Sequence, residues 1–130
     1  MSRRFARELA LQTLYGVEIG HRDTAEMLTE TLERAPTPET RTFVKDLVYG
    51  TLEFADQSDG EIAPLLEGWT IDRLSTIDRL LLRMGIYEIR HVPETPVPVV
   101  INEAVELAKK FSTEDSGRFV NGVLSRASAG

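Results

Sequence analysis

Residues 97–124 read VPVVINEAVELAKKFSTEDSGRFVNGVL, and their apolar spacing decides the fold class. Apolar side chains in the first half recur at steps of four, three, four and three residues: Val97, Ile101, Ala104, Ala108 and Phe111. Such steps place side chains on one face of an α-helix. In the second half, Ser112 and Asp115 are spaced like a capping box, and a new apolar face follows: Phe119, Val120, Val123 and Leu124. The stretch therefore predicts two consecutive helices, and Gly122 in the second is expected to let another helix approach closely.

The same spacing covers nearly the whole chain, and the glycine and proline residues fall mostly between the periodic runs. Seven or eight helices are predicted, the first six at about 3–19, 24–34, 39–55, 61–66, 71–74 and 75–90. The sixth is apolar on most sides, so we expect it to be central and the most buried. Five core positions are expected in this half of the chain: Leu81, Met84, Ile101, Val105 and Val123. No strand pattern stands out, and the predicted fold class is all-α.

The first predicted helix has a broad apolar face made by Phe5, Ala6, Leu9, Ala10, Leu14 and Val17. Leu11 and Tyr15 lie off that face. They either pack on a second helix or remain available to a partner, because an amphipathic helix normally buries only one stripe.

Length and composition restrict the class of protein. A domain of 130 residues hides about two thirds of its unfolded surface, so the chain needs no disulfide or metal to fold. It contains no cysteine, which removes disulfides, thiolate zinc sites and thiol nucleophiles. No apolar run approaches the roughly 20 residues of a membrane span, and the opening MSRRFARELALQ is too charged for a signal peptide. We therefore expect a cytoplasmic protein.

Charge is unevenly distributed along the chain. The net charge of −6 argues against nucleic acid, because affinity for phosphates comes largely from lysine and arginine. Both ends are nevertheless basic: residues 1–7 carry three arginines and no acid, and residues 109–130 carry four basic residues against two acids. If the ends meet in the fold, they form a patch suited to a short anion rather than a long duplex.

The chain shows no catalytic pattern. His21 and His91 fall in predicted loops without the spacing of metal ligands. Glu103 and Glu106 stand beside lysines on an amphipathic helix, where such a pair is typical of a solvated face. No phosphate-binding glycine motif is present. The sequence therefore predicts a protein that is not an enzyme and that uses neither metal nor cofactor.

Three segments resemble the NusB family of bacterial antitermination factors. RRFARELALQTLY (residues 3–15) resembles the arginine-rich first helix of the family, and LLRMGIYEI (81–89) resembles its central helix. Residues 97–124 resemble its C-terminal signature, of which INEAVELAK and FVNGVL are the most specific parts. The resemblance spans nearly the whole chain and is weakest over residues 20–68.

This resemblance implies an all-α fold of two packed helical subdomains, with residues 1–130 forming one NusB-type RNA-binding domain. It implies binding to boxA, a single-stranded element of nascent ribosomal RNA transcripts, together with NusE, a small-subunit ribosomal protein. The resulting complex helps RNA polymerase to pass terminators. The chain would then be a non-catalytic adaptor.

Two groups of residues match RNA-contacting positions of the family. The first is Arg3, Arg4 and Arg7, and the second is Lys110, Phe111, Asp115, Ser116, Arg118, Phe119 and Asn121. Aromatic rings stack on unpaired bases while arginine and lysine hold phosphates. Phe5 replaces another family arginine, so the basic cluster is thinner here. The spacing of Phe119 favours a core position, whereas Phe111 is equally suited to either role.

Three further residues match family positions that face NusE: Tyr15, Asp78 and Arg83. Tyrosine and arginine are common anchors of protein interfaces. The alternative for Asp78 is a charge at a helix start, and for Arg83 an ion pair within the chain.

Two other functions remain open at this point. The acidic charge and Phe5 also fit a helical protein-interaction or homodimerisation module with little RNA binding. A third hypothesis is the RNA-binding module of a ribosomal RNA methyltransferase, which is disfavoured because the chain has no cofactor-binding domain.

Overall fold

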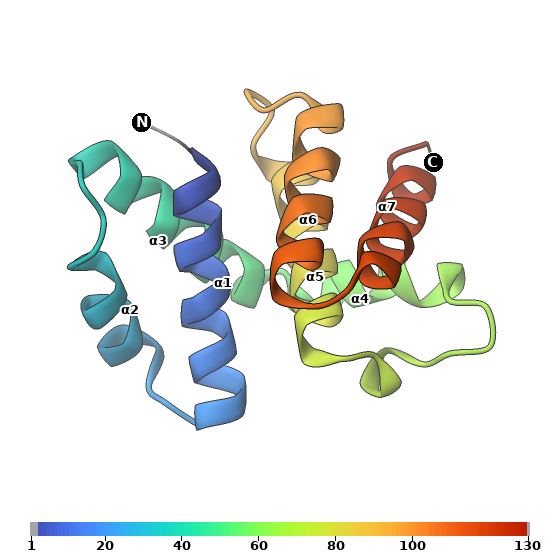
Figure 1. Cartoon of the computed structure of the whole chain (residues 1–130), viewed down its shortest axis with the longest axis horizontal. Helices are drawn as coiled ribbons and strands as arrows, with labels where there is room; N and C mark the ends of the chain where they lie inside the picture. Colours follow the sequence, from blue (N-terminus) through green and yellow to red (C-terminus); the bar gives the residue numbers. More distant parts are fainter. Residues whose placement is uncertain (1–2, 130) are drawn as a thin grey trace. The chain divides into compact units, whose positions relative to one another are not determined.

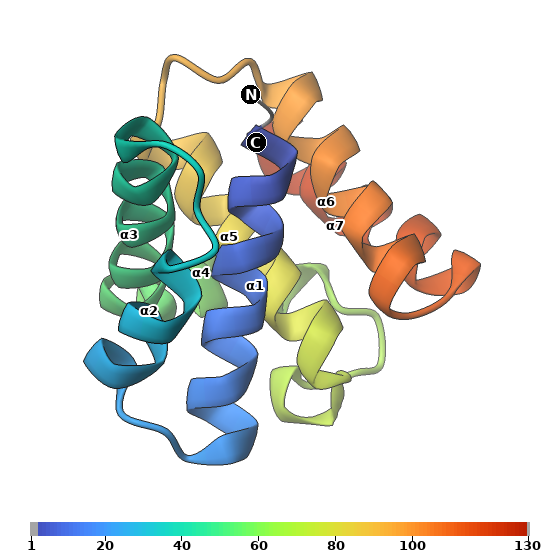
Figure 2. The same cartoon turned by 60° about the vertical axis from the view of Figure 1, so that its left-hand side comes forward.

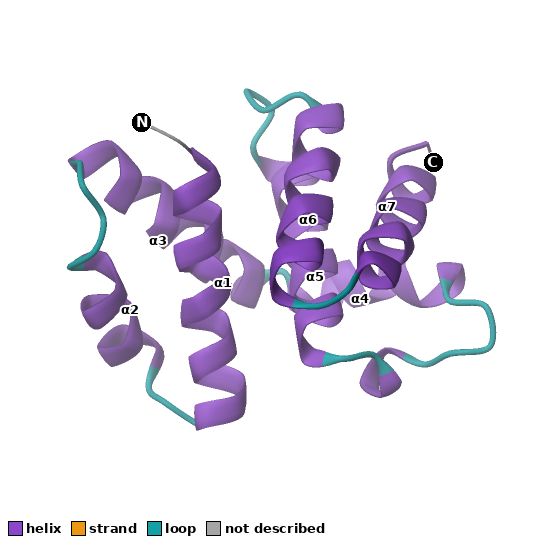
Figure 3. Ribbon diagram, in the orientation of Figure 1, coloured by secondary structure: helices purple, strands orange, loops and turns teal. Residues whose placement is uncertain are grey.

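Every regular element of the computed structural model is helical within residues 3–129, the part of the chain that the structure describes (Figure 1, Figure 3). The seven α-helices are α1 (Arg3–Gly20), α2 (Thr24–Leu32), α3 (Pro38–Glu53), α4 (Ala55–Ile62), α5 (Thr76–His91), α6 (Val97–Phe111) and α7 (Glu114–Ala129). Two short 3₁₀-helices, η1 (Ala63–Leu65) and η2 (Ile71–Arg73), stand between α4 and α5. The all-α prediction is confirmed.

The chain divides into two compact units, one of residues 1–52 and one of residues 53–130. The N-terminal unit contains α1, α2 and nearly all of α3, and the C-terminal unit contains α4 to α7 with both 3₁₀-helices. This division agrees with the two helical subdomains that the family resemblance implies.

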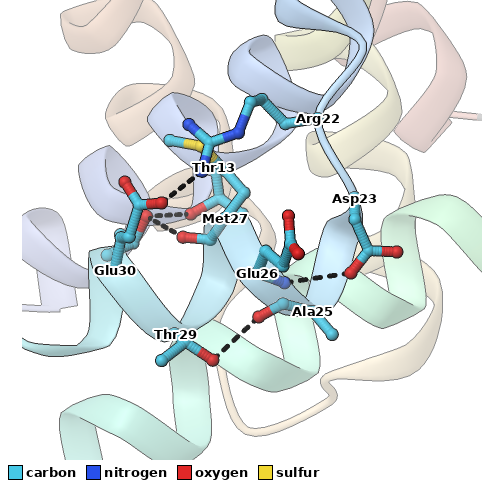
Figure 4. A network of polar contacts seen from close by, with 9 residues as sticks. Thr13, Arg22, Asp23, Ala25, Glu26, Met27, Thr29 and Glu30 are labelled. Carbon is cyan, nitrogen blue, oxygen red and sulfur yellow. Dashed lines mark hydrogen bonds and ion pairs between the residues drawn. The ribbon is translucent and has the colours of Figure 1, made fainter.

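In the N-terminal unit, α2 lies along α1 and the two helices approach closely (Figure 2). A Cβ atom added to Gly16 of α1 would lie 2.8 Å from the sulfur of Met27, so only glycine fits there without a shift. Beside this contact the buried hydroxyls of Thr13 and Thr31 form a hydrogen bond of 2.9 Å between the helices (Figure 4).

The start of α2 is held by polar contacts of its own. Asp23 caps the helix, because its carboxylate accepts a hydrogen bond of 3.1 Å from the backbone N–H of Glu26 (Figure 4). Arg22 forms an ion pair with Glu30, which lies one helical turn beyond Glu26. These contacts fix the loop at which the chain reverses from α1 to α2.

In the C-terminal unit, α5 is the central helix, as predicted. Eight of the nine residues between positions 80 and 88 of α5 are buried: Leu80, Leu81, Leu82, Met84, Gly85, Ile86, Tyr87 and Glu88. Helices α6 and α7 both pack on it and run antiparallel to each other (Figure 1). A Cβ atom on Gly85 would lie 2.8 Å from a methyl carbon of Leu124, so α5 and α7 are in direct contact there.

The expected core is partly confirmed. Leu81, Met84 and Val123 are buried, but Ile101 and Val105 are only half-buried. The buried side chains of α6 are instead Val100, Glu103, Ala104, Leu107 and Ala108. Because α6 packs on two helices, its buried face is centred on Ala104 and Leu107, and the predicted stripe lies on one flank of it. The expectation that Glu103 is solvated is wrong for the same reason.

Four local predictions differ from the structure. The predicted helix 61–66 covers the last two residues of α4 and the 3₁₀-helix η1, and most of α4 was not predicted because its sequence ADQSDGEI has too few apolar residues to show a period. Thr113 caps α7 in place of Ser112, accepting a 3.0 Å hydrogen bond from the backbone N–H of Ser116. His91 is the last residue of α5, and its ring stacks 4.0 Å from that of Phe54. Gly122 borders open space, so Gly85 rather than Gly122 allows the close helix approach.

Candidate nucleic-acid interface

The start of α1 forms a basic surface on the N-terminal unit. Arg3 is exposed, and its guanidinium lies over the ring of Phe43 at 4.1 Å from the centroid. Arg4 is also exposed. The first turn of α1 contains no acidic side chain, so these two cations add to the positive end of the helix dipole. An anion bound from outside would relieve that repulsion.

Arg7 has a different environment from the other two arginines. Its side chain is only 5% exposed, and its guanidinium lies 5.4 Å from the same Phe43 ring. A cation that is this deeply buried offers little surface to a phosphate. Arg7 is therefore better placed to hold Phe43 beneath Arg3 than to contact an outside anion directly.

The junction of α6 and α7 forms a second surface, on the C-terminal unit. Phe111, at the end of α6, is 36% exposed, and the ammonium of the exposed Lys110 lies 5.4 Å from its ring. On the first turn of α7, Asp115 and Arg118 form an ion pair in which both side chains are mostly exposed. Phe111 is therefore not a buried core residue, and its ring is partly accessible.

Three of the predicted RNA-contacting residues line one groove of about 340 Å³, which we call the α7 groove. Its lining is Trp69, Arg73, Leu74, Ser75, Asp78, Thr113, Asp115, Ser116 and Phe119. Ser116 is buried and donates a 2.7 Å hydrogen bond from its hydroxyl to the carboxylate of Asp78. Phe119 is half-buried in the wall of the groove. It is therefore neither a fully buried core residue nor a fully exposed ring.

Asn121 is not brought to the α7 groove. It lies on a different face of α7 and lines a second groove of about 420 Å³, together with Ile101 and Val105 of α6. Its side-chain oxygen accepts a 3.1 Å hydrogen bond from Ser125. The C-terminal stretch that resembles the family's RNA-facing segment is thus divided between two faces of α7.

The three residues predicted to face a protein partner have distinct environments. Tyr15 is 40% exposed, whereas Leu11 beside it is buried. Asp78 lies in the first turn of α5, whose cap is Ser75. Arg83 donates two hydrogen bonds, of 2.8 and 2.7 Å, to the carboxylate of Asp59. The alternative considered for Arg83, an ion pair within the chain, is therefore present.

Five residues of the α7 groove were missed by the sequence analysis: Trp69, Arg73, Leu74, Ser75 and Thr113. Trp69 is 55% exposed, and the guanidinium of Arg73 lies 5.8 Å from the centroid of its ring. The only available signal was a lone tryptophan that follows a glycine between two predicted helices. Periodicity carries no information about which way such a side chain points.

Comparison with known proteins identifies the family. A sequence model described as the NusB family matches residues 4–129. The chain belongs to the NusB family. The transcription antitermination protein NusB of Ruminiclostridium cellulolyticum is 46% identical to this NusB-family chain over 131 aligned positions, covering all of it and 90% of the relative.

Solved structures of the NusB family agree with this assignment. T. maritima NusB is 33% identical, with a TM-score of 0.92 over 99% of this chain and 92% of that one. A chain from the crystal structure of antitermination factors NusB and NusE in complex with double-stranded RNA is 29% identical. Its TM-score is 0.89, over 98% of this chain and 96% of that chain.

Within residues 3–129, no three histidine, aspartate or glutamate side chains gather in a group that would hold a metal ion. None of the helices in that range is both long and apolar enough to cross a membrane.

Proposed function

We propose that this chain is a transcription antitermination factor that acts by binding RNA and a NusE-type ribosomal protein, without catalysis of its own. The observation that carries the proposal is likeness along the whole chain to the NusB of a NusB–NusE–RNA complex, together with 46% identity to a transcription antitermination protein. The proposed RNA is a single-stranded boxA-like element, and RNA polymerase is the machine on which the complex acts.

The two basic surfaces have the chemistry that RNA binding needs. Arg3 and Arg4 are exposed cations at the positive end of a helix, suited to phosphates. Lys110, Phe111 and Arg118 combine cations with an accessible ring, suited to an unpaired base and its backbone. Arg7 acts in this proposal through Phe43, as a positioning residue.

The other proposed site residues divide by what they touch. Asp115, Ser116 and Phe119 contact RNA from the α7 groove, and Asn121 contacts it from the neighbouring face of α7. Tyr15 is the proposed anchor for NusE because its ring is exposed beside a buried face. Asp78 and Arg83 are proposed NusE contacts on the C-terminal unit and act less directly, since each already has a partner within the chain.

Titration of a dye-labelled boxA-like oligonucleotide tests this proposal, with fluorescence anisotropy followed in the presence and absence of NusE. We expect binding of the single strand that is stronger with NusE present, and weaker binding of a scrambled sequence. A matched duplex is titrated in parallel, because the related complex contains double-stranded RNA. Absence of RNA binding under both conditions, with a defined homodimer in sedimentation, would support the interaction-module alternative instead.

A further inference from the structure

The loop between η1 and η2 presents the only tryptophan of the chain to solvent. A tryptophan is large and mostly apolar, and it is rarely left exposed in an ordered position without a use. A single exposed apolar side chain is nevertheless ordinary on a protein surface. What singles out Trp69 is therefore its surroundings.

The loop that carries Trp69 is fixed on both sides of the ring. Leu66 is buried, and Gly68 has φ of +77°, a conformation that other residues rarely adopt. On the other side, a side-chain hydrogen bond with Thr70 lowers the pKa of Asp72 below its usual value. These features constrain the backbone on both sides of Trp69, whose ring lines the α7 groove.

The chemistry of the α7 groove matches a nucleotide. Trp69 and Phe119 supply apolar rings, and Asp115 supplies a carboxylate that can accept hydrogen bonds from the amino group of a base. Arg73 stands at the Trp69 ring, and an exposed cation–π contact of this kind is weak enough for the guanidinium to turn to a phosphate. The volume of about 340 Å³ is near the small end of ligand sites, roughly 300 to 1,000 Å³.

We propose that the α7 groove binds one nucleotide of the RNA, with its base stacked on Trp69 and its phosphate held by Arg73. This inference rests on the proposed RNA-binding function and names one contact within it. A peptide anchor is the competing occupant, but the lining favours the nucleotide. An apolar anchor would cover the charged groups of Arg73 and Asp115 without forming a hydrogen bond with either.

The single tryptophan makes the contact directly observable. The full chain is titrated with a boxA-like single strand while tryptophan emission and the anisotropy of the labelled RNA are recorded together. We expect emission to be quenched with the same midpoint as the rise in anisotropy. In a series of oligonucleotides that each lack one base, one position should restore the emission of the saturated complex, because only the stacked base quenches the ring.

Matched variants test the energetic contribution of the ring. Trp69→Ala should weaken RNA binding about 5- to 150-fold, the range for loss of one base–aromatic stack, and Trp69→Phe should retain most of the affinity. Arg73→Ala should reduce the salt dependence by the equivalent of about one phosphate. Tyr49→Ala is the control, because Tyr49 on α3 is a comparably exposed aromatic residue (48%) outside the α7 groove. The affinity of Tyr49→Ala for RNA should equal that of the unmodified chain. All variants should melt at the same temperature.

The outcomes separate this inference from the function on which it rests. Normal RNA binding by anisotropy, with unchanged emission and unchanged affinity of Trp69→Ala, would overturn the nucleotide site and leave the proposed function standing. Loss of all RNA binding by the unmodified chain, with and without NusE, would remove both. Quenching by NusE alone, without RNA, would assign the α7 groove to the protein partner and also overturn the proposal.

Discussion

At the scale of single residues, neighbouring arginines on one helix differ in what they can do. Arg3 and Arg7 both lie over Phe43, yet the first is exposed and the second buried. Arg3 and Arg7 are about one helical turn apart, so they lie on nearly the same face of α1. They differ in their place along the helix axis: Arg3 is the first residue of α1, whereas Arg7 lies one turn further in, where neighbouring side chains cover it. The sequence predicts the cluster but not which cation is covered.

Single substitutions should separate the roles of these arginines. Arg3→Ala and Arg4→Ala are each expected to reduce the slope of log affinity against log salt by about 0.7, the value for one phosphate of a single strand. Arg7→Ala should change that slope less and instead lower the free energy of unfolding by about 1 to 2 kcal/mol, because a desolvated cation–π contact is lost.

The measurements are RNA titrations at several salt concentrations and urea unfolding of each variant. Arg22→Ala is the control, because Arg22 is an exposed cation of the same unit that pairs with Glu30 far along α2. If Arg7→Ala alone flattens the salt dependence while Arg3→Ala does not, the assignment of roles is reversed.

Asp115 is expected to oppose RNA binding. It lies among the proposed RNA contacts, where its charge repels phosphates and also holds Arg118 in an ion pair. Asp115→Asn removes the repulsion and releases Arg118 toward the backbone. Two unit charges at about 4 Å interact by about 1 kcal/mol in water-like surroundings, so we expect binding about fivefold tighter, most clearly at low salt.

Glu114→Gln is the matched control for this substitution. Glu114 is an equally exposed acid of the same helix turn, but it does not line the α7 groove. Glu114→Gln should change the affinity for RNA less than Asp115→Asn does. Weaker binding of Asp115→Asn with loss of sequence preference would show that the hydrogen bond from a base to the carboxylate outweighs the repulsion between the carboxylate and the phosphates.

At the scale of elements, the sequence predicts long amphipathic helices well and short polar ones poorly. α5, α6 and α7 were found within a few residues of their bounds because each buries a continuous apolar stripe. α4 buries only Ser58 and Ile62, so its existence depends on tertiary contacts rather than on periodicity. His91, which was expected in a loop, extends α5 by one residue, and its ring stacks on that of Phe54 in a neighbouring segment.

Two glycines test whether the helix packing of the C-terminal unit is understood. Gly85→Ala should destabilise the protein by about 1 to 3 kcal/mol, because the new methyl group meets Leu124 at 2.8 Å in a packed core. Gly122→Ala, in a helix with open space at that position, should stabilise it by up to about 1 kcal/mol. Urea unfolding of the two variants measures both effects. Equal effects of the same sign would show that the contact between α5 and α7 is misplaced.

At the scale of the whole molecule, an acidic chain must bind a polyanion through small basic areas. The net charge is −6, and the proposed phosphate contacts are confined to the start of α1, the junction of α6 and α7, and Arg73 in the α7 groove. Few phosphates are neutralised in this way, so affinity for RNA alone should be modest and should fall only gently as salt is raised. A protein partner that binds the same complex adds affinity by thermodynamic linkage, and each ligand must strengthen the other by the same factor.

Tyr15→Ala tests this linkage. Loss of an exposed aromatic anchor should weaken NusE binding by about 1 to 3 kcal/mol. The free chain should bind RNA as before, because Tyr15 lies two helical turns beyond Arg7 on α1. The affinity for RNA in the presence of a fixed, sub-saturating NusE concentration should therefore fall toward the value of the chain alone.

Calorimetric titrations of NusE and RNA, each with and without the other, measure both sides of the cycle. Tyr49→Ala again serves as the control, since it removes an exposed tyrosine from α3 and should leave all four affinities unchanged. A lower free energy of unfolding for Tyr15→Ala with normal NusE affinity would place Tyr15 in the core and the partner surface elsewhere. The expected result for Tyr15→Ala is normal stability, weaker NusE binding and an unchanged RNA affinity of the free chain. This result would place the two ligands on separate surfaces, coupled only when both are bound.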